Sequence, residues 1–534
     1  MRSGPSVPDA VVVGAGHNGL VAANMLADAG WQVLVLEATD RPGGGVRSAE
    51  LVAPGYLSDL CSAFYPLAAC SPALAALDLP AYGLRWRHAP RVLAHVLPDD
   101  RAVVLSREVA ETAASVDAFA AGDGDRWAAA AADWDRFGDQ VTAALLSPFP
   151  PVRAGIRVLR DLRAAGAARL ARRLLLPART LAAELFRGEG ARAMLTGLAL
   201  HTDLTPLDAA SGVYGWLLAM LGQRHGFPVP AGGAQRLTDA LVARLLARHG
   251  KIVYGVRVAR IDTAHGRATG VSAADGRRWP AARAVLADVP APALYLNLIG
   301  PERLPAGLAD DMTRFQWDGA TVKLDWALSE PIPWSAGEAV GAGTVHLGGD
   351  VAGLTRASLD LADGRVPDRP FVLVGQMTTA DPSRSPAGTE CAWAYTHLPH
   401  RSQWTAAEVA DCAGRLEDLV EQHAPGFAKT VVARVVSGPA ELEQENPSLV
   451  GGALNGGTSA AYQQLFLRPV PGLGRADTPI DRLYLASASA HPGGGVHGAP
   501  GANAARAALA RERPVTGPFY GAAIRRTQRA LYGG

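Results

Sequence analysis

The sequence predicts an α/β fold in which the first and last parts of the chain build one domain. Apolar runs typical of buried parallel strands occur at residues 9–13, 31–36 and 483–487. A glycine-rich turn follows the first run, and another follows the last. An alanine-rich stretch with helical character comes after each of these turns. Units of strand, glycine turn and helix are typical of Rossmann-like domains.

The N-terminal unit carries the spacing G-x-G-x-x-G at Gly14, Gly16 and Gly19, and a helix is expected over residues 20–29. Gly14 permits the tight turn after the strand, Gly16 lets backbone amides approach a pyrophosphate, and Gly19 allows close helix packing. The helix N-terminus offers free amides and partial positive charge to phosphates. Glu37 ends the second apolar run, where an acid can accept hydrogen bonds from ribose hydroxyls. This order of elements predicts dinucleotide binding.

A second glycine-rich loop, A-T-D-R-P-G-G-G-V-R, follows Glu37 directly. Its candidate cofactor-binding residues on the phosphate side are Arg41, Gly43, Gly44 and Arg47. The loop resembles that of flavoproteins with two dinucleotide-binding folds, whereas nicotinamide dehydrogenases generally lack the glycine pair. The dinucleotide is therefore expected to be a flavin.

Near the C-terminus a strand, a glycine loop and a helix recur, with the helix expected over residues 500–510. The N-terminus of such a helix can stabilise the negative charge that develops on a reduced flavin. Candidate cofactor-binding residues in this region are Gly494, Gly495, Val496 and Asn503.

The motifs G-A-G-H-N-G-L, E-A-T-D-R-P-G-G and H-P-G-G-G-V-H-G-x-x-G-x-N-A-A together resemble the phytoene-desaturase-related FAD-dependent oxidoreductases. That family includes carotenoid desaturases, flavin-type carotenoid ketolases and retinol saturase. Blocks at 230–241, 446–457, 463–469 and 478–485 extend the resemblance along the chain. It implies FAD as the cofactor, with further contacts from His17, Asn18 and Ala38, and an adenine contact from the backbone of Val258.

The resemblance implies a flavoprotein with two dinucleotide-binding folds and an interleaved α+β substrate domain. The FAD-binding domain is expected to be discontinuous and to comprise residues 1–85, 226–290 and 471–515. The substrate domain is expected to comprise residues 86–225 and 291–470, and residues 516–534 are expected to form a C-terminal tail. The chain departs from many relatives at Ala486–Ser487 and at Ala490, which puts the detail of the flavin contacts in question.

Residues 151–187 form a basic segment with nine arginines, one aspartate and one glutamate. In a helical projection its apolar and basic side chains separate. The apolar side has Ile156, Leu159, Leu170 and Leu174, and the basic side has Arg153, Arg157, Arg160 and Arg172. Such a helix could lie on an anionic membrane surface, or it could pack its apolar stripe on the core.

Three residues of the middle of the chain, His201, Tyr214 and Trp216, are candidates for lining an apolar substrate pocket. Aromatic residues at such spacing are also typical of a simple core. His491 adjoins the C-terminal glycine loop and is the candidate catalytic residue, either in proton transfer or in positioning substrate. A purely structural role for His491 fits the sequence equally well.

Composition limits the remaining functions. The chain has 51 basic and 50 acidic residues and a net charge of +1, which argues against a nucleic-acid partner. Its four cysteines form no metal-binding pattern, so no metal is expected, and they fit a reducing, cytoplasmic setting. The N-terminus lacks the apolar core of a signal peptide and no apolar run is long enough to span a bilayer, although peripheral membrane contact remains open. Nothing in the sequence predicts an oligomeric state.

The expected activity is oxidation of an apolar, isoprenoid-like or polyene substrate by hydride transfer to flavin N5. This chemistry needs mainly proximity in a dry pocket, so it requires no catalytic triad. Desaturation is the leading reaction, with ketolation or saturation next and with oxygen or a quinone as the electron acceptor. The alternatives are a flavin amine or natural-product oxidase and a non-catalytic protein that binds a lipidated or apolar ligand.

Overall fold

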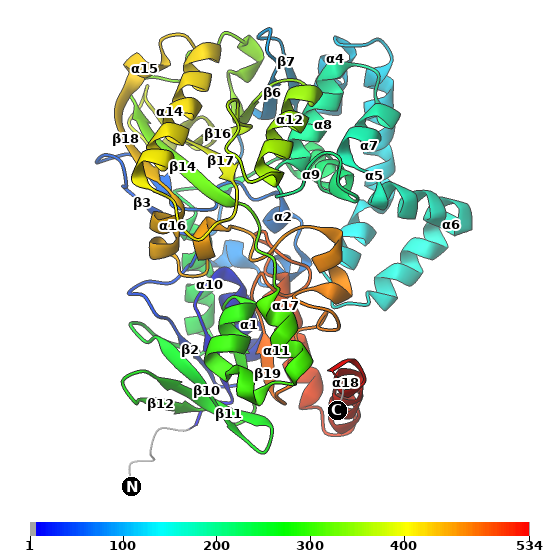
Figure 1. The fold of residues 1–534 in the computed structure, drawn as a ribbon, viewed down its shortest axis with the longest axis vertical. Coiled ribbons are helices and arrows are strands. Elements are labelled where there is room, and N and C mark those ends of the chain that lie inside the picture. The colour runs from blue at the N-terminus through cyan, green and yellow to red at the C-terminus, as the bar shows by residue number, and fades with distance from the viewer. Residues whose placement is uncertain (1–6, 533–534) are drawn as a thin grey trace.

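The computed structural model describes residues 7–532, apart from the side chains of residues 153–154, 157–159 and 161–165. Two regions lie one above the other along the longest axis (Figure 1). The lower region in that view contains a five-stranded parallel sheet and both ends of the chain, and the upper region contains a seven-stranded sheet with most of the helices.

The parallel sheet takes its strands from distant parts of the chain. Its order is β19 (Leu483–Leu485), β13 (Ala284–Ala287), β1 (Ala10–Val13), β2 (Val33–Leu36) and β9 (Lys251–Val253). All four residues of β1 are buried, because the strand lies at the centre of a sheet that is covered on both faces. The first and last strand–turn–helix units thereby lie in the same sheet.

Helices cover one face of this sheet, and a small antiparallel sheet packs on the other face. The helices are α1 (His17–Asp28), α10 (Gln235–Ala247) and α17 (Ala499–Arg511). The small sheet has β10 (Val258–Ala264), β11 (Arg267–Ala273) and β12 (Arg278–Pro280). Asn24 of α1 donates to the carbonyls of Leu20 and Leu241, which ties α1 to α10 within the core.

The seven-stranded sheet has a buried apolar face and a buried polar face. Its order is β18 (Val431–Ser437), β14 (Ala320–Leu328), β17 (Glu390–Leu398), β16 (Val372–Gln376), β15 (Ala342–Leu347), β6 (Arg91–Val96) and β7 (Ala102–Leu105). Helix α14 (Ala406–His423) packs on the apolar face through residues such as Leu416 and Val420. It begins at Thr405 with a reciprocal capping box to Glu408.

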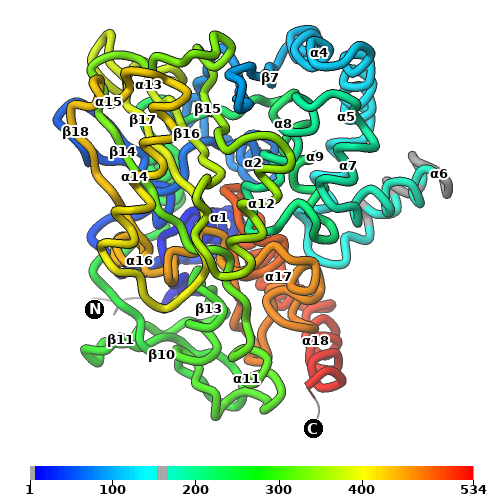
Figure 2. Tube along the Cα trace, turned by 45° about the horizontal axis from the view of Figure 1, so that its top comes forward, coloured from blue at the N-terminus to red at the C-terminus, as the bar shows by residue number. Residues whose placement is uncertain are grey.

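A helical layer stands beside this sheet. It contains α4 (Val109–Asp117), α5 (Asp123–Leu145), α6 (Val152–Leu175), α7 (Ala178–Leu185), α8 (Glu189–Ala199) and α9 (Ser211–His225). Shorter or peripheral helices are α2 (Pro66–Ala69), α3 (Pro72–Ala75), α11 (Ala306–Thr313), α12 (Val351–Ala362), α13 (Met377–Ala380), α15 (Phe427–Thr430) and α16 (Pro439–Glu445). In Figure 2 the helices α5, α7, α8 and α9 of this layer lie to the right of the strands β14, β16 and β17.

The basic segment 151–187 is not one helix, as the sequence pattern suggested, but two. Helix α6 ends before Leu176, whose backbone is extended at ψ 139°, and α7 begins after Pro177. A residue before proline is disfavoured in the helical conformation, which explains the break. The sequence pattern also placed Arg153 and Arg157 on the basic side of this helix and Leu159 on its apolar side. These three side chains lie outside the part of the chain that the structure describes.

Two further sequence predictions concern the C-terminal segment and membrane-spanning helices. The segment expected as a tail contains helix α18 (Gly517–Tyr532), where the Tyr520 hydroxyl donates to Asp477 at 2.7 Å. Among the described residues, no helix is both long and apolar enough to cross a bilayer.

Candidate cofactor and substrate site

A single large cavity of about 1100 Å³ extends from the carboxyl ends of β1 and β2 to the polar face of the seven-stranded sheet. Both sheets, the helical layer and the C-terminal glycine loop contribute to its walls. Its size slightly exceeds the usual range for a ligand pocket, about 300–1000 Å³. It therefore has room for a large cofactor together with part of a substrate.

The turn from β1 into α1 can be formed only by glycine at three points. Gly14 has a φ of 95°, and a Cβ on Gly16 would lie 2.5 Å from the Asp288 carboxylate. A Cβ on Gly19 would overlap the Gly14 carbonyl oxygen. The backbone amides at the start of α1 consequently lie open to the cavity, with Gly14, Gly16, His17 and Asn18 in its lining and Gly19 behind it.

Glu37 lies where β2 ends and is held in position by its neighbours. Its carboxylate accepts hydrogen bonds from the Ala15 amide at 2.7 Å and from the Thr39 amide and hydroxyl at 2.9 and 2.8 Å. Glu37 and Ala38 both line the cavity. A fixed carboxylate with remaining acceptor positions can bind the hydroxyls of a ribose.

The second glycine-rich loop lies against the first. The Gly43 amide donates to the Ala15 carbonyl at 2.9 Å, and a Cβ on Gly44 would lie 3.4 Å from the Gly16 Cα. Arg47 is buried, lines the cavity and forms an ion pair with Glu445 at 2.7 Å. The structure does not bring Gly43 or Arg41 into the cavity lining; Arg41 is exposed beside Asp40.

The C-terminal glycine loop closes the opposite wall. Gly494, Gly495 and Val496 line the cavity, as does the start of β10 at Val258. Behind the loop, α17 crosses α1 so closely that a Cβ on Gly501 would overlap the Asn18 carbonyl. Asn503 is buried in α17 and does not line the cavity.

Unpaired polar atoms mark this part of the cavity as a ligand site. His17 Nε2 and Asn18 Oδ1, on two residues that line the cavity, are buried without a hydrogen-bond partner among the described residues. Buried polar atoms in folded proteins almost always have partners. The open amides and the two close-packed glycine loops fit the phosphates of FAD, and the carboxylate of Glu37 fits its ribose. When bound, FAD would supply a flavin ring that can accept a hydride.

Two residues of this site were missed in the sequence. Asp288 follows the apolar run of β13 and accepts from the Gly19 amide at 2.8 Å. Burial raises the pKa of Asp288 to about 7, against the Gly19 hydrogen bond, with a further increase from Glu37. Lys323 lines the cavity from β14 and donates to both carboxylate oxygens of Asp325 at 2.6 and 2.5 Å. The polar residues alternating along an otherwise apolar β14 were the signal for Lys323.

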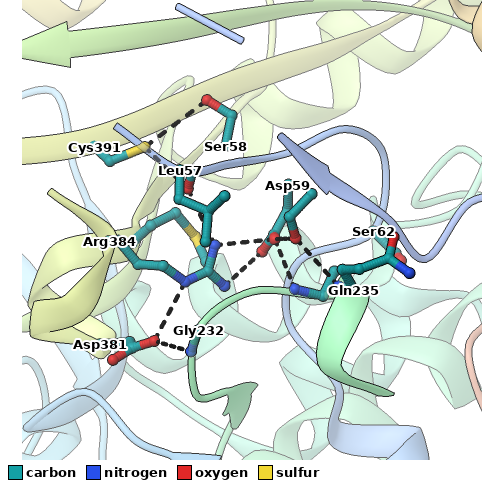
Figure 3. Close-up of polar contacts among 12 residues, drawn as sticks. Leu57, Ser58, Asp59, Ser62, Gly232, Gln235, Asp381, Arg384 and Cys391 are labelled. Carbon is teal, nitrogen blue, oxygen red and sulfur yellow. Dashed lines mark hydrogen bonds and ion pairs between the residues drawn. The ribbon is translucent and has the colours of Figure 1, made fainter. Parts of the chain in front are cut away.

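A buried ion pair fixes the chain segment that carries Cys61 and Ser62 into the cavity (Figure 3). The Arg384 guanidinium donates to both oxygens of Asp59, each at 2.9 Å. Asp59 also accepts from the Ala234 amide at 2.8 Å, so one carboxylate joins three separate parts of the chain.

The substrate side contains two of the three candidate pocket residues. His201 and Tyr214 line the cavity, and the Tyr214 hydroxyl donates to the Ser459 carbonyl at 3.0 Å. The interpretation of Trp216 as a pocket residue was wrong. Its ring packs against Trp134 at 5.1 Å and Phe137 at 6.3 Å in the core, because the inward face of α9 there meets α5.

His491 lines the cavity, and burial lowers its pKa to about 4. Its Nε2 lies 3.1 Å from the Ser147 carbonyl, so the neutral ring carries its proton on Nε2. His491 Nδ1 then has a free lone pair, and it has no partner among the described residues. Among the described residues, no cluster of side chains could hold a metal ion.

Two family models match the chain. The one described as NAD(P)-binding Rossmann-like domain covers residues 12–76, and the one described as Flavin containing amine oxidoreductase covers residues 130–387. An oxidoreductase from Methanosarcina mazei and cyclohexylamine oxidase from Brevibacterium oxydans share the fold, each with a TM-score of 0.60 and 17% identity. These alignments cover 94% and 95% of this chain and 99% and 100% of the two structures.

Curated relatives match over nearly the whole chain. Pyridine nucleotide-disulfide oxidoreductase domain-containing protein 2 of Mus musculus is 28% identical, over 93% of this chain and 92% of that protein. Hydroxyneurosporene desaturase of Cereibacter sphaeroides is 30% identical, over 94% of this chain and 98% of that protein. The chain therefore belongs to the phytoene-desaturase-related family of FAD-dependent oxidoreductases, and FAD is its cofactor.

Proposed function

We propose that the protein desaturates an apolar polyene or isoprenoid-like substrate, passing a hydride to FAD. The apolar lining of the cavity beyond the glycine loops carries this proposal. It includes Leu146, Leu174, Leu217, Leu218, Phe227 and Leu373. Long hydrocarbon substrates gain binding free energy from such surfaces at about 25 cal/mol per Å² buried. The similarity to a hydroxyneurosporene desaturase over 94% of the chain supports the same class of reaction.

Desaturation removes a hydride from one carbon and a proton from its neighbour, and a double bond forms between them. When bound, FAD would supply an acceptor for the hydride, and oxygen or a quinone would take up the two electrons afterwards. His491 Nδ1, with its free lone pair, is the acceptor that we assign to the proton. Apolar walls around the site exclude water and hold the substrate in position.

Anaerobic reduction of the purified holoenzyme tests this proposal. Acyclic polyenes should bleach the oxidised flavin absorption, and a product with one more double bond should appear. Absence of bleaching with every polyene tested would reject the proposal. His491→Gln should slow the reduction about 100-fold or more, within the usual contribution of general bases, while FAD content stays unchanged.

Oxidation of an amine is the second candidate function, and one observation favours it. Trp393 and Tyr395 stack with ring centres 5.8 Å apart, and both line the cavity beside Phe64. Aromatic faces of this kind attract ammonium groups. In the same anaerobic assay, amines would then bleach the flavin whereas polyenes would not. If the protein is instead a non-catalytic binding protein, neither polyenes nor amines should reduce its flavin.

We further propose that the rim of the cavity rests on an anionic membrane surface. Leu175 of α6 and Leu465 both line the cavity and remain exposed, and Phe466, which follows Leu465 in the chain, is 53% exposed. Arg169 is exposed on the same helix. Exposed apolar side chains at the cavity, together with an exposed arginine on the same helix, favour an interfacial position from which a lipid-dissolved substrate could enter.

Sedimentation with vesicles containing phosphatidylglycerol tests the membrane contact. The wild-type holoenzyme should sediment with the vesicles, and the double variant Leu175→Glu with Phe466→Glu should stay in the supernatant. Val432→Glu, which alters an exposed apolar residue of β18, is the matched control and should behave as wild type. Equal sedimentation of all three proteins would contradict the rim as the contact surface.

A further inference from the structure

Arg468 is a buried cation in the wall of the cavity. It lines the cavity and is only 1% exposed. Its guanidinium donates to the carbonyls of Ala488, Thr458 and Asn455 at 2.8, 3.0 and 3.0 Å, and it makes longer contacts with two further carbonyls of loop 454–459. These carbonyls satisfy its N–H groups, but they carry no net charge that would neutralise the guanidinium.

Two acidic residues interact with this cation at longer range, and both bind the N–H groups of the same loop. Asp318 accepts from the Asn455 amide at 2.8 Å, and Asp203 accepts from the Ser459 amide at 2.8 Å. Neither acid lines the cavity, whereas Arg468 does. Arg468 forms no ion pair with a carboxylate of the described residues, so its charge lies at the cavity without an anion beside it.

Three other arginine or lysine side chains line the cavity among the described residues. Arg47 and Lys323 are paired with carboxylates at 2.7 and 2.5 Å, and Arg257 is exposed to solvent. Exposed charges are screened by water and salt, whereas a buried charge acts through a medium of lower dielectric constant. Arg468 is therefore the cation whose charge should act most strongly inside the cavity.

The guanidinium of Arg468 lies directly against the C-terminal glycine loop. A Cβ on Gly493 would lie 3.3 Å from its Cζ. The next two residues, Gly494 and Gly495, line the cavity, and helix α17 begins after Gly498. The charge of Arg468 and the partial positive charge at the start of α17 thus meet at the loop that is expected to face the flavin.

Arg468 stays charged at neutral pH. Burial lowers its pKa, and Tyr214, Asp318 and Asp203 oppose this effect. Because the ordinary pKa of a guanidinium is so high, the group remains protonated throughout the range in which the protein would work.

We infer that Arg468 stabilises the negative charge that hydride transfer places on FAD, and so raises the affinity of the bound cofactor for electrons. A hydride carries two electrons and one proton, so a neutral oxidised flavin gains one negative charge when it accepts a hydride. A fixed cation in a dry site stabilises such a charge without reorganisation. The inference rests on the hydride transfer of the proposed function, a step that amine oxidation shares, and it does not depend on which substrate is oxidised.

A redox titration of the holoenzyme without substrate tests the role of Arg468. Arg468→Gln removes the charge and keeps a hydrogen-bond donor for the loop carbonyls, whereas Arg468→Lys keeps the charge. The equilibrium constant for two-electron reduction, measured against a dye of known potential, should fall at least about tenfold in Arg468→Gln. One unit charge acting over about 10 Å at an effective dielectric constant of about 20 has an effect of this size. For a two-electron couple the change corresponds to about 30 mV.

Two matched proteins show whether charge is the cause. Arg468→Lys should change the equilibrium constant about threefold or less, because the cation is retained. Arg475→Gln is the control: Arg475 also donates to a backbone carbonyl, that of Phe149 at 3.1 Å, but it does not line the cavity. It removes the same net charge from the protein and should leave the equilibrium constant of the wild type nearly unchanged.

The absorption spectrum of the fully reduced holoenzyme gives a second readout. A nearby cation favours the anionic form of the reduced ring over the form that has taken up another proton. The reduced wild type should therefore show the anionic spectrum at pH 6 as well as at pH 8. In Arg468→Gln the spectrum should change to that of the neutral form as pH falls from 8 to 6.

The possible outcomes separate this inference from a structural role of Arg468 and from the proposed function. Equal reduction equilibria in Arg468→Gln and the wild type overturn the inference, and so does an equal loss in Arg468→Gln and Arg468→Lys, which would indicate displacement of the loop. A neutral reduced flavin in the wild type at pH 6 overturns it without any variant. If neither polyenes nor amines reduce the flavin but the dye titrations differ as expected, the role of Arg468 stands and the proposed function is wrong.

Discussion

Asp59 and Arg384 form a fully enclosed ion pair that joins the segment entering the cavity to the loop between α13 and β17 (Figure 3). Both side chains have no exposed surface, and the two hydrogen bonds between them are 2.9 Å long. Asp381 approaches the same guanidinium at 3.3 Å and also accepts from the Gly232 amide at 2.7 Å. The pair thus fixes the relative position of chain segments that are distant in the sequence.

Removal of Arg384 should strongly destabilise the protein. Arg384→Ala leaves Asp59 and Asp381 buried without their cation, and breaking a buried pair in this way costs about 3–5 kcal/mol. Urea unfolding of the holoenzyme, followed by circular dichroism and by flavin release, measures the loss. The control is Arg365→Ala, which removes exposed pairs to Asp360 and Asp363 and should leave the unfolding midpoint unchanged. Similar midpoints for the two variants would contradict the role of the Asp59–Arg384 pair.

Gly501→Ala should separate α17 from α1 and weaken FAD retention. The added methyl group would overlap the Asn18 carbonyl, so the helices must move apart at the point where Asn18 faces the cavity. We expect FAD content after gel filtration to fall at least severalfold. Gly414→Ala in α14 has open space around the new methyl group and should be neutral or stabilising by about 0.5–1 kcal/mol. Full flavin content in Gly501→Ala would show that the close crossing is dispensable.

Local motifs in the sequence predicted the FAD site because its parts are short and contiguous. Gly14, Gly16 and Glu37 belong to one contiguous strand–turn–helix–strand unit, whose spacing is sufficient to indicate dinucleotide binding. Asp288 could not be recognised in this way, since its partner Gly19 is 269 residues distant along the chain. The parallel strand β13 alone brings the two together.

The substrate side was harder to predict because tertiary packing decides which face of a helix meets the cavity. Tyr214 and Trp216 are two residues apart on α9, so they point to different sides of the helix. Tyr214 reaches the cavity, whereas Trp216 packs among the aromatic residues of α5. Strand register has a similar effect in the seven-stranded sheet. It aligns side chains from Lys323 of β14 to His95 of β6 across five strands, and no local pattern in the sequence reveals this alignment.

FAD affinity should fall as pH rises through about 7, because of Asp288. Burial raises the pKa of this carboxyl to about 7. The carboxyl lies beside Gly16 and Gly19, in the turn whose backbone amides are expected to bind phosphate. Bound phosphates would raise the pKa further, so the protonated form binds FAD more tightly and the advantage is lost on deprotonation. The rate of FAD release, followed by flavin fluorescence, should therefore be severalfold higher at pH 8.5 than at pH 6. Asp288→Asn should remove this dependence, and a variant that keeps the wild-type slope would exclude Asp288 as its source.

The buried histidines should make the fold sensitive to acid, and His95 offers the clearest test. Burial lowers its pKa from 6.5 to about 4, against a hydrogen bond to the Gly349 carbonyl at 3.0 Å. Below pH 6.5 the unfolded chain takes up a proton at this ring while the folded protein does not, so stability is lost as pH falls from 6.5 towards 4. His346 and His201 beside it share the direction of this shift, because burial lowers the pKa of each.

His95→Gln retains a donor for Gly349 but has no charge to gain. Between pH 7 and pH 5 the variant should lose about 2 kcal/mol less unfolding free energy than the wild type. Denaturant titrations at the two pH values measure this difference, and equal losses in the two proteins would mean that His95 does not contribute to the acid sensitivity.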